Sequence, residues 1–248
     1  MESMTHTLEV WGDLACFTRP EMKVERYSYP IMTPSASRAV FDAVYRKPKL
    51  RWQVTEIKIM SEPRYIALRR NEVKEKAPPA NTILQWAEGK KPPEPLWADG
   101  DRDSLGTDQK GRTQRQTMAL KNVRYRVSAR IVPWPEYRGE VRGMEEQFLR
   151  HARRGQCIYQ PYLGCREFPS FFRLIEPSEP PESPFPLDLN LGWMLYDVFD
   201  LSRPGTPHDS PCVSLFRAVV RKGVLDVPEY ESPEVRKPPK EVRSCSTT

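Results

Sequence analysis

The 248-residue chain lacks the features that define several classes of protein. Its 12 glycines have no period of three, which excludes a collagen-like repeat. No apolar run approaches the length of a membrane span, and residues 1–10 contain no signal-peptide core. We therefore expect a soluble, cytoplasmic protein that does not bind membranes.

Metal ligands and disulfide partners are also scarce. The five cysteines form no C-x-x-C pair, and their odd number argues against a disulfide framework. The three histidines lie far apart, so no set of zinc ligands has the required spacing. We expect free thiols in a reducing compartment, no metal site and no cofactor, with Cys157 and Cys165 as metal ligands the weaker alternative.

Proline is abundant, at 26 residues, and 17 of these lie in residues 74–111, 176–211 and 228–248. The net charge of +6 is unevenly spread, since residues 19–51 carry +5, residues 110–154 carry +8 and the remainder carries −7. Tyrosines, which can stack on bases, lie among the positive charges. Such blocks favour a nucleic-acid footprint, and an ordinary solvated surface is the alternative.

The hydrophobic pattern predicts the element order β-α-β-β-loop-β-α-β, which is typical of a ferredoxin-like or RNA-recognition sandwich. Thr33 and Pro34 mark a helix start, and Pro48 stops this helix. A second helix is expected over residues 140–154. The expected strands cover residues 8–17, 51–60, 64–70 and 120–132, and residues 157–167 are expected to form a strand and a turn.

The fold class expected is therefore α+β. Residues 1–175 form a ferredoxin-like domain, in which residues 74–111 are a long inserted loop with one helical turn near residues 82–88. Residues 176–227 form a small β-sheet domain with apolar runs at 191–200 and 212–220. Residues 228–248 are polar and proline-rich, and we expect a flexible tail there.

Four stretches carry a family resemblance: VWGDLACF at residues 10–17, YRKP at 45–48, RTQR at 112–115 leading into LKNVRY at 120–125, and GQC at 155–157 followed by PYLGCREFP at 161–169. Together they resemble the type I-C branch of the fifth CRISPR-associated (Cas) family, from about residue 5 to about residue 230. The resemblance implies a RAMP-type protein with a ferredoxin-like N-terminal domain and a smaller C-terminal β domain.

The resemblance also implies a function. In this branch the protein cuts precursor CRISPR RNA at the base of the repeat hairpin without a metal. It then stays on the 5′ handle of the crRNA and caps the Cascade complex beside the backbone and large subunits, with target DNA contacted indirectly. We interpret the long loop as a contact to a neighbouring subunit or to target DNA near its PAM.

Tyr45 matches a catalytic tyrosine of the family, although it could instead pack a helix end. Where some members have a Lys-His pair, this chain has Met144, which cannot act, and Glu145, which would repel phosphate. Arg150 and His151 are the expected substitutes, His151 as general acid, although an exposed histidine at a cationic helix end is equally consistent with the sequence.

The expected RNA contacts are basic residues of the two positive segments. A non-cleaving scaffold on the crRNA 5′ handle is the alternative function, and a generic RNA-recognition protein is a weaker one. The expected contacts are Arg19, Lys23, Arg26, Arg38, Arg46, Lys47, Arg112, Arg115, Lys121, Arg124, Arg126, Arg130, Arg153, Arg154 and Arg166.

Overall fold

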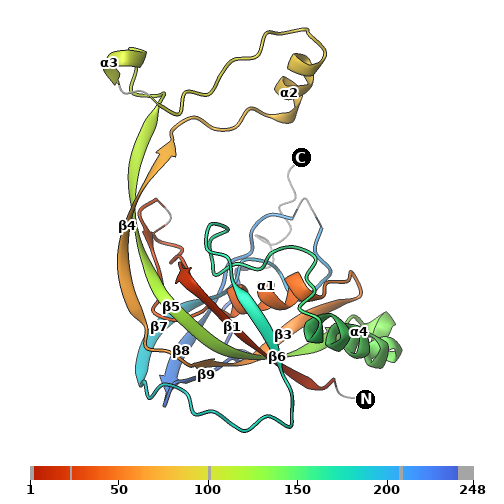
Figure 1. Cartoon of the computed structure of the whole chain (residues 1–248). Helices are drawn as coiled ribbons and strands as arrows, with labels where there is room; N and C mark the ends of the chain where they lie inside the picture. The colour runs from red at the N-terminus through yellow and green to blue at the C-terminus, as the bar shows by residue number, and fades with distance from the viewer. Residues whose placement is uncertain (1–2, 23, 100–101, 207–208, 240–248) are drawn as a thin grey trace.

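An antiparallel sheet organises the chain, as seen in a computed structural model that describes residues 3–22, 24–99, 102–206 and 209–239 (Figure 1). Within these residues the sheet has nine strands, seven of them in the order β6-β1-β5-β3-β9-β8-β7. The strands are β1 Thr5–Ala15, β2 Arg26–Tyr27, β3 Leu50–Ile59, β4 Arg64–Val73, β5 Arg112–Pro133, β6 Phe171–Ile175, β7 Leu189–Asp197, β8 Ser214–Arg221 and β9 Val224–Asp226. The helices are α1 Pro34–Val44, α2 Ala80–Ala87, α3 Arg102–Leu105, the 3-10 helix η1 Pro135–Glu140 and α4 Val141–Arg153.

Two helices, α1 and α4, pack on one face of the sheet. Thr33 caps α1, since its Oγ1 accepts a hydrogen bond from the Ala36 amide at 3.3 Å, and Pro34 opens the first turn. The aromatic rings of Phe41, Trp52 and Phe148 join α1, β3 and α4, with centroids 4.7 and 4.8 Å from that of Trp52. Both helices were predicted from the sequence, and α1 ends at Val44, earlier than Pro48 requires.

Strand β5 serves two parts of the molecule. Its second half alternates buried Val123, Tyr125 and Val127 with arginines, and it pairs with β1 and β3 in the centre of the sheet. Its first half pairs with β4 to form a two-stranded arm that projects from the body and carries α2 and α3 (Figure 1). The strand predicted from the sequence begins only at residue 120. Residues 112–118 are almost all polar, so they show no alternation of apolar and polar side chains.

Of the strand and turn predicted over residues 157–167, the structure has the turn but not the strand. This segment contains only an isolated bridge between Tyr162 and Pro169, and the expected edge strand is β6. Gly164 has a φ of +83° and lies against the carbonyl of Cys16, where a Cβ would approach the oxygen to 2.1 Å. That position requires glycine, so the segment turns here instead of extending.

The C-terminal strands continue the same sheet. Strand β9 pairs with β3, and Phe216 and Tyr230 belong to the hydrophobic cluster that contains Trp52. A separate sheet for residues 176–227 was therefore not found, because β9 pairs with the backbone of β3 that would otherwise be an open edge. Tyr230 and Val235 are buried, so the expected tail is packed at least as far as Val235, and residues 240–248 lie outside the described residues.

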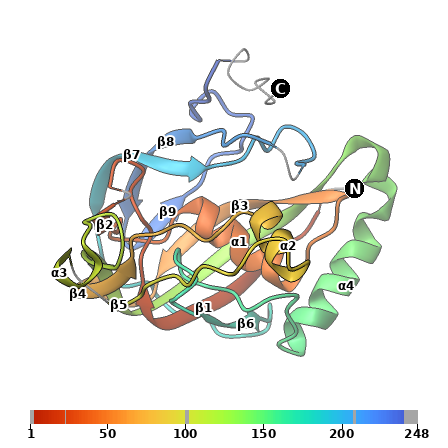
Figure 2. The same cartoon turned by 90° about the horizontal axis from the view of Figure 1, so that it is seen from above.

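Among the described residues no helix is long and apolar enough to cross a bilayer. Seen from above, α4 runs along one edge of the body near the start of β1 (Figure 2), whereas the side view shows the arm projecting from the body (Figure 1). The sheet thus supports two separate surfaces, one at the ends of α1 and α4 and the other at the base of the arm.

Candidate functional site

Tyr45 follows the last turn of α1 and faces one side of α4. Gln147, Arg150, His151 and Arg154 share that side, because their spacing of three, four and seven residues places them on one helix face. The Tyr45 hydroxyl donates a hydrogen bond to Gln147 Oε1 at 3.0 Å, and the rings of Tyr45 and His151 meet edge to face with centroids 5.8 Å apart. These four α4 residues and Tyr45 form what we call the α1–α4 site.

His151 is oriented by the end of α1. Its Nδ1 lies 3.2 Å from the carbonyl oxygen of Val44. Because a carbonyl can only accept, Nδ1 must carry the hydrogen in this bond. The neutral ring therefore leaves Nε2 unprotonated, and His151 can accept or, once protonated, donate a proton through that atom.

Tyr45 keeps its proton at neutral pH. Burial raises the pKa of its hydroxyl, the positive charge of Arg150 acts in the opposite direction, and Glu140 raises it further. Its carbonyl accepts a hydrogen bond from Trp52 Nε1 at 2.9 Å, which fixes the backbone where the chain leaves the helix. Tyr45 is thus held as a neutral hydrogen-bond donor.

Exposed cations surround this cluster. Arg46, Lys47, Arg150 and Arg154 are exposed and form no ion pair within the part of the chain that the structure describes. The ammonium of Lys47 lies 6.0 Å from the centroid of the Tyr45 ring. Charges without a carboxylate partner are available for an anionic ligand, so the α1–α4 site suits phosphate.

Met144 and Glu145 face away from this site. Met144 is part of the core, and Glu145 Oε1 accepts hydrogen bonds from Ser3 Oγ at 2.8 Å and the Met4 amide at 2.6 Å. The residue that α4 turns toward Tyr45 is Gln147, which the sequence analysis missed. Its spacing from His151 was the available signal.

Comparison with known proteins identifies the family. The model of the family described as CRISPR-associated protein (Cas_Cas5), Cas5d, matches residues 6–228. The chain belongs to the Cas5 family, type I-C. A CRISPR pre-crRNA endoribonuclease Cas5d of Mannheimia succiniciproducens is 37% identical over 238 residues, which cover 93% of this chain and 97% of that relative.

A second relative agrees with this membership, and a solved structure shows a similar fold. A CRISPR pre-crRNA endoribonuclease Cas5d of Thermus thermophilus is 35% identical over 243 residues, which cover 92% of this Cas5 chain and 93% of the relative. A solved structure of a CRISPR-associated protein matches with a TM-score of 0.59 at 18% identity, covering 95% of this chain and 98% of that one. The resemblance seen in the sequence is therefore confirmed.

Other predicted RNA contacts of this Cas5 protein are engaged in ion pairs on the opposite face of the sheet. Arg124 and Arg126 bind Glu182 Oε2 at 2.6 and 2.7 Å, and both bind Glu9 Oε2 at 3.0 Å. Burial alone would raise the pKa of Glu9, but the hydrogen bonds from the arginines outweigh it and lower the pKa to about 2. Arg130 likewise binds Glu229 Oε2 at 2.9 Å.

The remaining predicted contacts are scattered. Arg38 is bound by Asp42 and Asp197, and its distance to Asp197 Oδ2 is 2.7 Å. The Arg19 guanidinium lies 4.8 Å from the centre of the Tyr29 ring. Arg26 pairs with Glu167, Arg115 with Glu72 and Arg153 with Glu176. Three further residues form no ion pair with a described residue: Arg112, Lys121 and Arg166. Lys23 lies outside the described residues.

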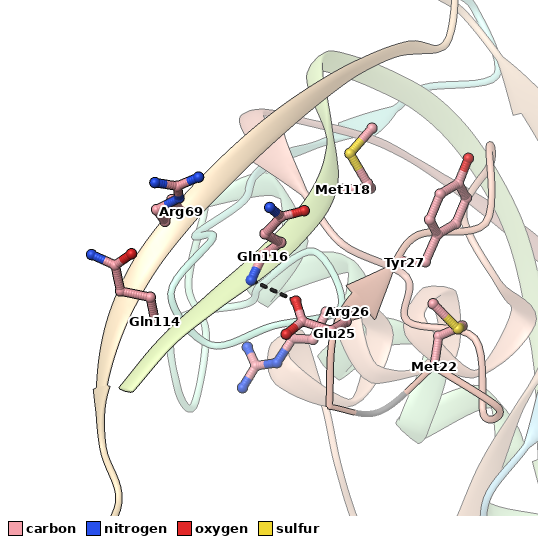
Figure 3. A pocket seen from close by; sticks show the side chains of 8 residues that line it. All are labelled: Met22, Glu25, Arg26, Tyr27, Arg69, Gln114, Gln116 and Met118. Atoms are coloured by element: carbon pink, nitrogen blue, oxygen red, sulfur yellow. Dashed lines mark hydrogen bonds between the residues drawn. The ribbon is translucent and has the colours of Figure 1, made fainter. Parts of the chain in front are cut away.

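A cavity of about 440 Å³ lies at the base of the arm of this Cas5 protein, between the arm strands and residues 22–27 (Figure 3). Its position is distinct from the α1–α4 site, and none of its lining residues belongs to α1 or α4. The lining residues are Met22, Glu25, Arg26, Tyr27, Arg69, Gln114, Gln116 and Met118.

Proposed function

We propose that this Cas5 protein cuts precursor CRISPR RNA at the base of the repeat hairpin and then holds the crRNA 5′ handle as a Cascade subunit. The observation that carries the proposal is the Tyr45–Gln147–His151 cluster with unpaired cations around it. Both Cas5d relatives, 37% and 35% identical over nearly the whole chain, are named pre-crRNA endoribonucleases, which supports the activity.

The reaction we propose is attack of an RNA 2′-hydroxyl on the adjacent phosphorus, with no metal taking part. A base removes the 2′-hydroxyl proton, the P–O5′ bond breaks, and the 5′ oxygen receives a proton. The products are a 2′,3′-cyclic phosphate and a 5′-hydroxyl. Such a reaction needs in-line positioning, proton transfer and stabilisation of negative charge.

The α1–α4 site has a group for each of these tasks. For proton transfer, His151 in its doubly protonated form donates the Nε2 proton to the 5′ oxygen as general acid, and water accepts the proton of the 2′-hydroxyl. Tyr45, which is protonated, exchanges its bond to Gln147 for one to a phosphate oxygen when RNA enters past Lys47. Arg150 stabilises the charge that develops on the phosphate, which accounts for its place beside Tyr45.

The fold and the assembly belong to the same proposal. The succession β1-α1-β3-β5-α4-β6, with both helices on one face, supports our assignment of a ferredoxin-like, RAMP-type domain. We propose that strands β7–β9 correspond to the smaller C-terminal β domain. The protein acts in the cytoplasm next to the backbone and large subunits, and it contacts target DNA only indirectly.

The test is cleavage of a repeat hairpin RNA by the purified protein in EDTA. We expect one cut at the stem base and a single-turnover rate about 100-fold lower in Tyr45→Phe. Tyr65→Phe is the matched control, because the Tyr65 hydroxyl bonds only the Ser28 carbonyl on the arm side and its loss should leave the rate unchanged. Cleavage that requires an added metal would contradict the mechanism.

A non-cleaving scaffold is the second candidate function. The burial of Met144 and Glu145 favours it, since the Lys-His pair of some family members has no counterpart at those positions. Tight binding of an RNA that stays intact with the wild-type protein would support this function and reject the nuclease.

A further inference from the structure

The cavity at the base of the arm presents a regular array of side chains. Gln114, Gln116 and Met118 occupy alternate positions of β5 and therefore lie on one face. Arg69 of β4 stands opposite Gln116 in the strand register, and Tyr27 of β2 stands beside Met118. Figure 3 shows Arg69, Gln114, Gln116 and Met118 along the arm strands, and Met22, Glu25, Arg26 and Tyr27 on the neighbouring segment.

The hydrogen-bonding capacity of the cavity is only partly used. Glu25 Oε2 accepts a bond from the Gln116 main-chain amide at 2.6 Å, which holds Glu25 against the arm. Arg26 is occupied by Glu167 Oε1 at 3.0 Å. The side-chain amides of Gln114 and Gln116, the Arg69 guanidinium and Glu25 Oε1 have no partner among the described residues.

This chemistry fits a base better than a phosphate group. A site for phosphate alone would be lined by free cations, whereas this cavity holds two neutral amides, a carboxylate and only one free arginine. A glutamine amide offers a donor and an acceptor in one plane, the pattern that pairs with the edge of adenine, and a carboxylate accepts from the amino group of cytosine. The tyrosine and the two methionines supply apolar contact for a ring.

We propose that this cavity binds one unpaired base of the RNA, and that the base carries an exocyclic amino group. Gln116 and Gln114 read the base edge, Glu25 accepts from the amino group, and Arg69 contacts the adjoining phosphate. Uracil, which has no amino group, is disfavoured. The inference rests on the proposed function, since it assumes that RNA is the ligand, and it adds a subsite that selects sequence away from the cut.

The test is a binding cycle between the protein and a repeat-derived RNA at fixed salt. Abasic nucleotides are placed at each unpaired position in turn, and affinity is measured by fluorescence anisotropy. At one position we expect the abasic change to weaken wild-type binding about tenfold, and uracil to weaken it equally. Gln116→Ala weakens binding of intact RNA about tenfold, yet causes no further loss with the RNA that is abasic at that position.

Matched variants keep the test decisive. Gln114→Ala repeats the measurement with a second exposed residue, and Gln109→Ala changes a glutamine in the arm loop outside the cavity and should leave affinity unchanged. Gln109→Ala should also cleave repeat RNA at the wild-type rate. The subsite would be overturned if the variant and the abasic change weakened binding independently, or if all four bases bound equally, and cleavage could still support the nuclease. A wild-type protein that binds no RNA would reject both proposals.

Discussion

At the scale of residues, the sequence predicts least well which arginine and lysine side chains lack an ion-pair partner. The position of Tyr45 at the end of α1 could be predicted, because the stop signal at Pro48 is local. The partner of an arginine is not local: Arg38 binds Asp197, 159 positions away, and Arg126 binds Glu9, 117 positions away. The sequence therefore predicted a row of free arginines where the structure has ion pairs, and it could not single out Arg46, Lys47, Arg150 and Arg154.

Substitutions of Glu145 and of Gln147 should have opposite effects on the stability of the protein and on its cleavage rate. Glu145→Ala leaves the Ser3 hydroxyl and the Met4 amide without their acceptor, so we expect a loss of about 1–3 kcal/mol in the free energy of unfolding. Its single-turnover cleavage rate should stay within about twofold of wild type. Gln147→Ala should do the reverse, lowering the rate with little change in the thermal midpoint, and a slower cut by Glu145→Ala would contradict this assignment.

Glu9 should make stability depend on pH. Its pKa is about 2 in the folded protein, against an ordinary value near 4.5, so the folded state binds the proton less readily. The stabilisation is therefore complete above about pH 5 and is lost as the pH falls from 4.5 toward 2. Glu9→Gln should cost about 3 kcal/mol at pH 7, because the buried Arg126 loses its buried carboxylate and keeps only the half-exposed Glu182 as a partner.

Denaturant unfolding at pH 7, 4 and 3 checks this expectation. The difference in the free energy of unfolding between wild type and Glu9→Gln should become smaller as the pH falls. The matched control is Glu182→Gln. Glu182 binds the same two arginines but is half-exposed, so its loss should cost under about 1 kcal/mol. Equal costs for the two variants would contradict the role given to burial.

At the scale of elements, predictability follows from the environment of each strand. The second half of β5 is buried on one face and shows clear alternation, so its position could be predicted. The first half lies in the arm, where both faces meet solvent and no apolar period is imposed. The edge strand β6 was misplaced because residues 157–167 are apolar enough for a strand, while the turn at Gly164 depends on contact with Cys16.

The arm tip should be dispensable for folding. Helix α2 has no buried residue, and Ile83 and Leu84 are 50% and 57% exposed. Replacing residues 78–99 by a glycine-serine linker should therefore leave the thermal midpoint within about 2 °C, because little burial is lost. Cleavage of repeat RNA should also persist.

The same replacement tests the role of the tip in the complex. We expect weaker assembly with the other Cascade subunits or weaker binding of target DNA, because exposed apolar side chains on a projecting arm suit a contact to another molecule. Pull-down of the subunits and a DNA-binding assay measure these effects. Unchanged assembly together with unchanged DNA binding would reject the contact.

At the scale of the whole molecule, the sheet and the charge each join parts that the sequence separates. The proline-rich stretch after residue 175 indicated a second module, yet β9 pairs with β3 and makes the C-terminal strands part of the central sheet. A three-residue strand has no periodicity, and its partner is distant, so this pairing could not be predicted. Glu182 of the same stretch neutralises Arg124 and Arg126 of β5, which leaves the free positive charge elsewhere.

RNA affinity should therefore depend on salt through a small set of residues. If Arg46, Lys47, Arg150 and Arg154 each neutralise one phosphate, the plot of log affinity against log salt should fall with a slope of about −3 or steeper. Arg154→Gln should make the slope shallower by about 0.7. Arg153→Gln is the matched control, because the neighbouring Arg153 is paired with Glu176 at 2.8 Å and contributes no free charge. A flat salt response, or equal effects of the two variants, would show that ion pairing does not decide which arginines bind RNA.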